Sequence, residues 1–381
     1  MDKHHEMTEA IVLGAGAAGL AAAATLRRVG VQVIVLERTD QVAASWRSRY
    51  DGLRLNTTGT MSTIPGYRAR RRRYGEFPSR DKWIEYLENY AKHHRLDVRF
   101  GSEVQSVARE NGGWRVGTNR GEFNARFVVV ATGYDHDPDL PDWPGRDGFT
   151  GELIHSSAYK HPEPYVGRDV LVVGPGTTGS EIATLLLRGG AGRVRVACRT
   201  PPNLITRKVL GTSVNVSGIV LNHVPIPVAD EITWRLQRIL FGNLEPYGIP
   251  RSPYGLATTV FKRQQTPVYD AGFVRLLKSG EIKIVPAVVG FDGSDVLLAD
   301  GTRIQPEAVI AATGYLRGLE PLVGYLGVLD ENGIPLVSGG KEHPSAPGLF
   351  FNGFRANLSG QLRLMRPDAR AIAKAARKQR P

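Results

Sequence analysis

Apolar and polar positions along the chain alternate between short continuous apolar runs and longer amphipathic stretches, and one arrangement of the two occurs twice. Residues 9–38, EAIVLGAGAAGLAAAATLRRVGVQVIVLER, combine an apolar run, a glycine-rich break, an amphipathic stretch and a second apolar run. Residues 168–200, RDVLVVGPGTTGSEIATLLLRGGAGRVRVACRT, repeat the same order. Each segment therefore predicts a strand, a tight turn, a helix and a second strand.

The first segment has the glycine spacing of a dinucleotide-binding turn. Gly14 permits the tight turn, Gly16 lets the backbone approach a pyrophosphate, and Gly19 allows close packing of helix and strand. Glu37 ends the second strand, where a carboxylate can accept hydrogen bonds from a ribose. Because strand, helix, second strand and acidic end all occur in the expected order, we predict a dinucleotide-binding site here. Its acidic end suits FAD.

The second segment repeats the spacing with Gly174, Gly176 and Gly179, but its second strand ends near Arg199 in place of an acid. A guanidinium pairs with a 2'-phosphate that a carboxylate would repel. A charge-assisted hydrogen bond contributes about 1.5–3 kcal/mol, which corresponds to roughly a ten- to hundredfold preference for NADPH over NADH. The alternative interpretation of Arg199 is an ordinary surface arginine.

A second repeat supports duplication of the whole unit. Residues 126–135, RFVVVATGYD, and residues 307–316, EAVIAATGYL, each carry an apolar strand into Ala-Thr-Gly-Tyr. We therefore predict an α/β protein with two dinucleotide-binding, Rossmann-type domains, the NADP domain inserted into the FAD domain. The expected boundaries are 1–160 for the first part of the FAD domain, 161–315 for the NADP domain and 316–381 for the C-terminal part of the FAD domain.

The composition fits two such domains. The chain has 381 residues, of which 41% are hydrophobic, and no uncharged apolar stretch of about 18 residues suggests a membrane span. The N-terminal residues MDKHHEMTEA lack the apolar core of a signal peptide, so we expect a cytoplasmic protein without membrane association. Cys198 is the single cysteine, which excludes a redox dithiol and thus the dithiol reductases. No metal site is expected.

The net charge of +12 favours anionic ligands in general, and its densest run is RARRRR at residues 68–73. A solvated basic loop is the simplest interpretation of this run, which includes Arg70 to Arg73. Steering of a phosphorylated cofactor or an acidic substrate is the second. Nucleic-acid binding is disfavoured because only Tyr67 and Tyr74 offer nearby stacking and no binding fold surrounds them.

The connection between the two units contains a further motif, FTGELIHSSAYK, with Phe149, Gly151, His155 and Tyr159 at F-x-G-x-x-x-H-x-x-x-Y spacing. Together with GAGAAG, GPGTTG and AATGY, this order resembles the flavin-containing monooxygenases over nearly the whole chain. The Baeyer–Villiger relatives carry Trp followed by Pro or Asp at the end of the motif, where this chain has Tyr159-Lys160, which argues against ester-forming chemistry.

Two branches of that family compete. From about Ile154 onward, HSSAYK, VLVVGPGTTGSEIA, RQQTPVYDAG and KSGEIKIVP resemble the plant YUCCA enzymes, which oxidatively decarboxylate indole-3-pyruvate. Upstream, LRLNTTGTM resembles the branch that oxygenates nitrogen and sulfur, in which an asparagine lies beside the reactive flavin edge. The matching residue is Asn56, whose alternative role is that of a turn-forming asparagine.

The resemblance implies FAD, NADPH and O2 as reactants and a C4a-hydroperoxyflavin that delivers the oxygen atom. It implies Asn56 and retained NADP+ as hydrogen-bond donors at the reaction centre. It implies His155 and Tyr159 as residues that maintain the interdomain geometry, with proton transfer as their alternative role; Trp46 could equally be a core residue. The implied FAD contacts are Gly14, Gly16, Gly19, Glu37, Arg38, Trp46, Arg47, Val104, Ala131, Thr132, Gly133 and Gln361. The implied NADP contacts are Gly174, Gly176, Thr177, Thr178, Gly179, Arg199, Ala312, Thr313 and Gly314.

Residues 200–265 form the least repetitive part of the chain and are expected to supply a substrate wall or lid, or a homodimer contact. Arg207, Lys208, Lys262 and Arg263 in or beside it could hold a substrate carboxylate. The leading hypothesis is oxygenation of a nitrogen or sulfur centre of a small molecule. The alternatives are YUCCA-type decarboxylation of an aryl 2-oxo acid and an NADPH oxidase without oxygenated product.

Overall fold

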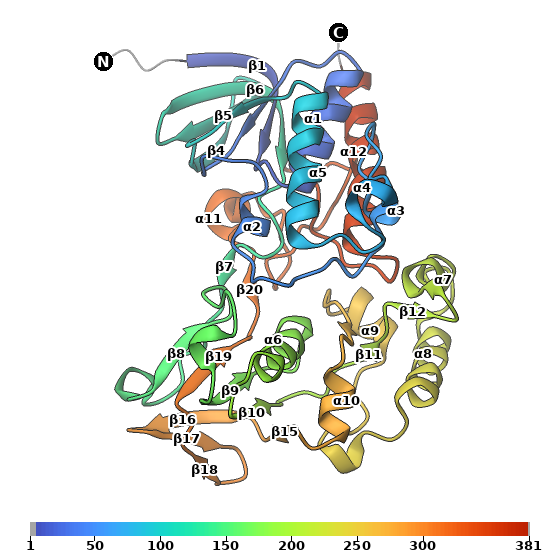
Figure 1. Cartoon of the computed structure of the whole chain (residues 1–381). Coiled ribbons are helices and arrows are strands. Elements are labelled where there is room, and N and C mark those ends of the chain that lie inside the picture. The colour runs from blue at the N-terminus through green and yellow to red at the C-terminus, as the bar shows by residue number, and fades with distance from the viewer. Residues whose placement is uncertain (1–4, 380–381) are drawn as a thin grey trace.

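The computed structural model describes residues 5–379, and Figure 1 shows them as two α/β units, one above the other. The first unit contains a sheet in the order β3-β2-β1-β6-β5-β4, with β21 also pairing with β6. The paired strands β1, β2, β3, β6 and β21 run parallel, whereas β4, β5 and β6 form an antiparallel meander. The strands are β1 (His5–Leu13), β2 (Val33–Leu36), β3 (Asp97–Arg99), β4 (Val104–Glu110), β5 (Gly113–Thr118), β6 (Gly121–Val130) and β21 (Leu349–Phe351).

Helices α1 and α12 pack side by side on one face of this sheet, with α5 beside them (Figure 1). Alanines on α1 and small residues of α12, such as Ala369, Ala373 and Ala376, are buried between them and allow a close approach. The helices are α1 (Ala17–Arg28), α2 (Ala44–Arg47), α3 (Gly59–Ser62), α4 (Arg71–Tyr74), α5 (Arg80–His93), α11 (Glu320–Val323), α12 (Gln361–Lys378) and a 3-10 turn at Gly324–Leu326.

The second unit has a parallel sheet in the order β15-β10-β9-β19-β8, with α6 and α10 packed against it. An antiparallel meander, β16 to β18, lies at its lower end in Figure 1. The elements are β8 (Glu152–His155), β9 (Asp169–Val173), α6 (Thr177–Arg188), β10 (Arg193–Ala197), α10 (Phe273–Lys278), β15 (Ile282–Val285), β16 (Val288–Asp292), β17 (Asp295–Leu298), β18 (Arg303–Ile304), β19 (Ala308–Ala311) and 3-10 turns at Arg146–Gly148 and Glu163–Tyr165.

All strands of the second sheet fall between β6 and β21 of the first, so the second domain is inserted into the first. The prediction of two Rossmann-type domains with this nesting is confirmed. The two connections between the domains run side by side, because β7 (Asp137–Pro138) pairs antiparallel with β20 (Tyr315–Leu316). Strand β8, which the expected boundary at residue 160 assigned to the first domain, pairs with β19 in the second sheet.

Residues 200–265 form a largely helical extension of the second domain, seen at the right of Figure 1. Its helix α8 buries Ala229 and Thr233 and leaves Val228, Ile232 and Ile239 exposed. The elements of this extension are β11 (Leu204–Ile205), β12 (Lys208–Val209), β13 (Thr212–Ser213), α7 (Val214–Leu221), α8 (Ile226–Phe241), α9 (Leu256–Phe261) and a 3-10 turn at Glu245–Tyr247. Strand β14 (Val268–Tyr269), just after the extension, pairs with β11.

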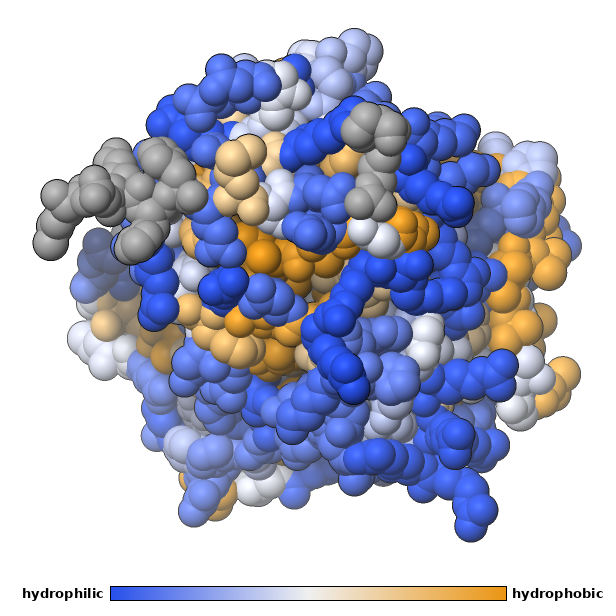
Figure 2. Space-filling view, turned by 90° about the horizontal axis from the view of Figure 1, so that it is seen from above, coloured by the Kyte–Doolittle hydropathy of each residue, from blue (hydrophilic) through white to orange (hydrophobic). Residues whose placement is uncertain are grey.

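Seen from above in Figure 2, the molecule is mostly polar, and apolar residues gather near the centre of this face and along its right edge, with smaller patches elsewhere at the rim. Within residues 5–379 no helix is both long and apolar enough to cross a bilayer. The same described residues contain no group of three or more side chains arranged to hold a metal ion.

Candidate active site at the domain interface

The two glycine-rich turns have almost the same geometry. A Cβ on Gly14 would lie 2.7 Å from the carbonyl oxygen of Ala131, and a Cβ on Gly174 would lie 2.7 Å from that of Ala312. Both glycines have a φ near +100°, at 102° and 103°, which residues with a side chain rarely adopt. Each turn therefore requires glycine where it passes the end of the neighbouring Ala-Thr-Gly strand.

The middle glycines differ from the first ones in a way that fits a bound pyrophosphate. A Cβ on Gly16 or Gly176 would meet no protein atom within 4 Å, so both backbones border open space. These glycines are also the N-caps of α1 and α6, and no side chain caps either helix. The free N–H groups of each helix end thus remain available to an anion, as FAD and NADP require.

The ends of the neighbouring strands complete both cradles. The Ala131 N–H donates to Leu13 at 3.0 Å, and the Ala312 N–H donates to Val173 at 2.8 Å. The Thr132 hydroxyl beside the first turn is buried without a hydrogen-bond partner among the described residues. A buried hydroxyl without a partner costs stability unless a ligand satisfies it, so Thr132 supports occupation of this cradle.

The strand ends bear opposite charges, as the sequence predicts. Glu37 is buried, and its carboxylate accepts hydrogen bonds from the Ala15 N–H at 2.8 Å and from the N–H and hydroxyl of Thr39 at 3.0 and 2.9 Å. It is therefore fixed beside the glycine turn with acceptor capacity left for a ribose. Arg199 lies two residues after the end of β10 and is exposed, with no side-chain partner among the described residues.

The other residues implied for FAD lie around this first cradle with varied contacts. Arg38 approaches His136 at 3.4 Å, Arg47 pairs with Glu88, and the Gln361 amide donates to the Gly353 carbonyl at 2.7 Å. Trp46 packs edge-on against Trp83, with ring centroids 6.1 Å apart, and Val104 begins β4. The structure adds Asn352, which the sequence analysis did not identify. Its buried Oδ1, like the Thr132 hydroxyl, has no hydrogen-bond partner among the described residues.

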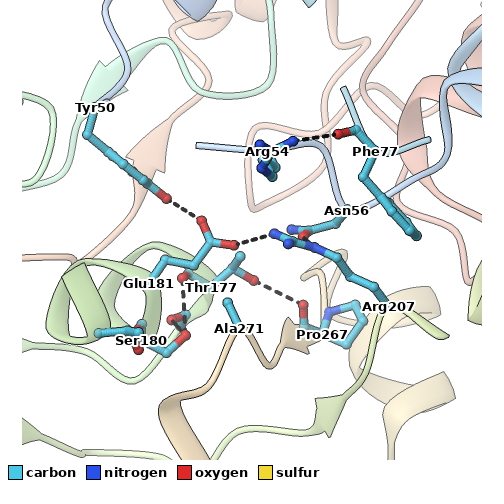
Figure 3. Close-up of polar contacts among 12 residues, drawn as sticks. Tyr50, Arg54, Asn56, Phe77, Thr177, Ser180, Glu181, Arg207, Pro267 and Ala271 are labelled. Carbon is cyan, nitrogen blue, oxygen red and sulfur yellow. Dashed lines mark hydrogen bonds and ion pairs between the residues drawn. The ribbon is translucent and has the colours of Figure 1, made fainter. Parts of the chain in front are cut away.

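A partly buried polar network joins the two domains at Asn56 (Figure 3). The Arg207 Nε donates to Asn56 Oδ1 at 2.9 Å, and its Nη2 pairs with Glu181 Oε1 at 3.1 Å. The Tyr50 hydroxyl donates to the other oxygen of Glu181 at 2.6 Å. Burial raises the pKa of Glu181 above its usual value, against the opposing effects of Tyr50 and Arg207.

The sequence analysis did not identify Tyr50 and Glu181, although the internal repeat contains a signal for the latter. Glu181 comes two residues after Gly179, and the matching position after Gly19 is Ala21, which is fully buried. A carboxylate on a helix face that is alanine in the first copy indicates a polar partner across the interface.

The cations suggested as carboxylate ligands do not converge. Arg207 is paired with Glu181, and Lys208 is paired with Glu76 at 2.6 Å. Arg263 lies over the Tyr254 ring at 4.2 Å, and Lys262 is exposed. The two cations that face the interface are thus already neutralised by carboxylates of the chain.

The F-x-G-x-x-x-H-x-x-x-Y motif follows the edge of the second sheet. Phe149 packs on Phe291, and a Cβ on Gly151 would lie 2.6 Å from the Phe149 ring. His155, at the end of β8, receives the Ser157 N–H on Nδ1 at 3.1 Å and contacts the Gly314 carbonyl through Nε2 at 3.0 Å. This arrangement assigns the proton to Nε2 of a neutral ring and makes His155 a tie between β8 and the Ala-Thr-Gly strand.

Tyr159 lies between the aromatic rings of Tyr50 and Tyr165, and burial raises its pKa. Its hydroxyl has no hydrogen-bond partner among the described residues. Thr177 donates to the Pro267 carbonyl at 3.1 Å, and Thr178 and Thr313 are half-buried beside the second cradle. Gly133 lies three residues after the end of β6. Among the motif residues, the ring contacts of Phe149 and Tyr159 and the hydrogen bonds of His155 are thus contacts within the chain.

Burial lowers the pKa of His155 below its ordinary value of 6.5. As the pH falls toward and below 6.5, the unfolded chain binds the proton more readily than the folded protein does. The unfolding free energy therefore decreases as the pH decreases. We expect the unfolding free energy of the native protein to fall between about pH 7.5 and about pH 5.5, and His155→Gln to fall less, with a limit of about 1.4 kcal/mol per pH unit. Urea unfolding at both pH values measures this, with His223→Gln at an exposed histidine as the control. Equal slopes for His155→Gln and native protein would contradict the assignment.

Comparison with known proteins reveals the family. Residues 11–231 match the family model described as pyridine nucleotide-disulphide oxidoreductase. The probable indole-3-pyruvate monooxygenase YUCCA3 of Arabidopsis thaliana is 34% identical over 364 residues, covering 92% of this chain and 83% of that protein. This chain belongs to the flavin-containing monooxygenase family. The indole-3-pyruvate monooxygenase YUCCA1 of Oryza sativa subsp. japonica is a further relative, 36% identical over 311 residues, covering 80% of this chain and 76% of that protein.

Among solved structures, the flavin-containing monooxygenase from Stenotrophomonas maltophilia superposes with a TM-score of 0.73 at 23% identity, covering 97% of this chain and 98% of that one, which supports the fold. As a flavin-containing monooxygenase, the protein is an oxidoreductase that depends on FAD, NADPH and O2. The disulphide chemistry in the description of the family model does not extend to it, because Cys198 is its only cysteine and burial raises the pKa of that thiol to about 11.

Proposed function

We propose that this monooxygenase oxidatively decarboxylates an aryl 2-oxo acid of the indole-3-pyruvate type. The proposal rests on the sequence identity of this chain to two relatives, 34% to YUCCA3 of Arabidopsis thaliana and 36% to YUCCA1 of Oryza sativa subsp. japonica. Both names include indole-3-pyruvate monooxygenase, and the matches extend over most of each protein. The reaction consumes the 2-oxo acid, O2, NADPH and a proton and yields the acid one carbon shorter, CO2, water and NADP+. The leading hypothesis from the sequence, oxygenation of nitrogen or sulfur, becomes the second candidate, favoured by Asn56.

The chemistry that bound FAD supplies is acceptance of a hydride from NADPH and activation of O2. In this proposal the first cradle, with Gly14, Gly16, Gly19 and Glu37, holds FAD, and the second, with Gly174, Gly176, Gly179 and Arg199, holds NADP. Asn56 lies where the two domains meet, and among the described residues its amide NH2 has no hydrogen-bond acceptor. It can therefore donate to the reacting oxygen, which stabilises developing negative charge.

A 2-oxo acid also requires a cation for its carboxylate, and Arg54 is the candidate. Leu55 is buried, whereas Arg54 before it is exposed and Asn56 after it is half-buried, so Arg54 and Asn56 both lie away from the core that Leu55 enters. Arg54 is exposed, has no carboxylate partner among the described residues and donates only weakly to the Phe77 carbonyl, at 3.4 Å. Figure 3 places it beside the network of Asn56 and Arg207.

We expect Arg54→Gln to raise KM for an aryl 2-oxo acid about tenfold, because one charge-assisted hydrogen bond to the carboxylate is lost. KM for an uncharged thioether should change little if that compound is turned over. Steady-state kinetics with both compounds measure the difference, with Arg251→Gln on the distant Trp234 ring as a control for lost charge. An equal rise in KM for both compounds would remove Arg54 from carboxylate recognition.

The proposed function is tested by mass balance. The purified protein is supplied with FAD, NADPH and indole-3-pyruvate, a thioether or a tertiary amine, and NADPH, O2, hydrogen peroxide, CO2 and products are measured. One CO2 and one shortened acid per NADPH support the proposal. An N-oxide or sulfoxide with no CO2 would establish the second candidate, and one peroxide per NADPH with every compound would leave an oxidase.

A further inference from the structure

The side chain that touches Asn56 comes from the other domain. Asn56 lies in the first domain, after α2, whereas Arg207 lies between β11 and β12 in the extension of the second domain. Glu181, the carboxylate that holds Arg207, lies on α6 next to the second glycine turn. Tyr50, which holds Glu181, lies in the first domain again. The network therefore crosses the domain interface twice.

We propose that Arg207 is a positioning residue that orients the Asn56 amide, and that Glu181 and Tyr50 hold Arg207 in place. This inference rests on the proposed role of Asn56 as the donor to the reacting oxygen. Because Arg207 Nε occupies the carbonyl oxygen of the Asn56 amide, the NH2 group must face the opposite way. Without that contact the amide can rotate and present its oxygen, which repels developing negative charge.

The geometry of a guanidinium suits this task and that of an ammonium does not. Arg207 uses Nε at 2.9 Å from Asn56 and Nη2 at 3.1 Å from Glu181, two N–H groups of one rigid plane. A lysine at this position would keep the charge and could still pair with Glu181, but it has one nitrogen and cannot keep the fixed two-point contact. Charge and orientation can thus be separated by experiment.

The surroundings of Glu181 explain why Arg207 is fixed and not free for a substrate. Glu181 is only 7% exposed, and a buried carboxylate is stable only when paired and hydrogen-bonded. Its two oxygens are used by Tyr50 at 2.6 Å and Arg207 at 3.1 Å. The donor at Asn56 is consequently oriented only when the second domain, with Glu181, sits against the first.

The test compares Arg207→Lys, Asn56→Ala and the double variant in the FAD-loaded protein. We expect each single variant to raise the ratio of hydrogen peroxide to oxygenated product about tenfold, the loss expected for one hydrogen bond to a developing charge. The double variant should be no worse than Asn56→Ala, because Arg207 acts through Asn56. The rate of FAD reduction by NADPH should stay near the native rate in all three.

A second measurement does not depend on turnover. Urea unfolding midpoints of the same three proteins report the contact itself, and the double variant should shift less than the two single shifts combined. Arg195→Lys is the matched control, because Arg195 also pairs with a carboxylate of the second domain, Asp169 at 2.5 Å, and makes no contact with Asn56. It should leave the peroxide ratio unchanged.

The outcomes separate this inference from the proposed role of Asn56. If Asn56→Ala does not change the peroxide ratio, the role of Asn56 and the inference fall together. If Asn56→Ala raises the ratio but Arg207→Lys does not, or if their effects multiply, Asn56 keeps its role and the positioning by Arg207 is wrong. Tyr50→Phe keeps all charges and removes only the hydrogen bond to Glu181. If this variant also raises the peroxide ratio, the series of contacts from Tyr50 through Glu181 to Arg207 is supported. An unchanged ratio overturns the role assigned to Tyr50 and leaves positioning of Asn56 to Arg207.

Discussion

Replacing Gly14 with alanine should produce a protein that no longer retains FAD and therefore has no monooxygenase activity. The added Cβ would lie 2.7 Å from the Ala131 carbonyl oxygen, and the residue would be held at a φ of 102°. Strained backbone of this kind costs about 1–3 kcal/mol, so the turn must shift out of the shape that brings the helix end to the pyrophosphate. We expect FAD affinity to fall more than a hundredfold and the unfolding free energy to fall by about 1–3 kcal/mol.

Two further alanine variants separate strain from contact with the cofactor. Gly112→Ala also places a side chain at positive φ, 77°, but meets no atom within 4 Å and is remote from the cradle, so only stability should fall. Gly16→Ala meets no protein atom, so it should fold normally and yet bind FAD weakly. Flavin absorbance after gel filtration, together with urea unfolding, measures both properties. Full FAD retention by Gly14→Ala would show that this turn does not hold the cofactor.

Replacing Arg199 with glutamate should reverse the choice of nicotinamide cofactor. The variant loses a guanidinium that would pair with the 2'-phosphate of NADPH and gains the acidic end that the first cradle has in Glu37. We expect kcat/KM for NADPH to fall about a hundredfold, because the variant loses the attraction between the guanidinium and the 2'-phosphate and gains a carboxylate that repels it. We expect kcat/KM for NADH to rise. Anaerobic FAD reduction with each cofactor measures the change without involving the substrate.

Lys278→Glu is the matched control for this charge reversal. Lys278 ends α10, directly before β15, and therefore lies at the amino end of the parallel sheet, opposite the glycine turn. It changes the net charge of the chain by the same amount as Arg199→Glu. If both variants lower kcat/KM for NADPH equally, the effect is a general one of charge, and Arg199 is an ordinary surface arginine.

The fold and both cradles could be predicted from the sequence because their determinants are local. The spacing of Gly14, Gly16 and Gly19 encodes a backbone shape within a few residues, and the repeat at Gly174 encodes it again. The Ala-Thr-Gly strands could be placed because parallel strands in such a unit end beside the turn. Nesting of the domains followed from the order of these motifs along the chain.

The polar network could not be predicted in this way because its partners are far apart in sequence. Arg207 looks like a free cation in the chain, and only the packing of α6 shows that Glu181 neutralises it. Glu181 follows a glycine turn in a stretch typical of a buried helix, and Tyr50 has no distinguishing neighbour. The sequence analysis therefore identified Asn56 as a candidate catalytic residue. It assigned Arg207, which contacts Asn56 in the fold, to binding of a substrate carboxylate.

The paired connections β7 and β20 join the two domains at a single place. The chain passes from the first sheet to the second and back through one two-stranded ribbon, in which Tyr315 lies opposite Pro138 and Leu316 opposite Asp137. The covalent links between the domains are therefore concentrated at one place. The hydrogen bonds from Arg207 to Asn56 and from Tyr50 to Glu181 join the domains independently of that ribbon, so their loss would weaken the interface without breaking the chain connection.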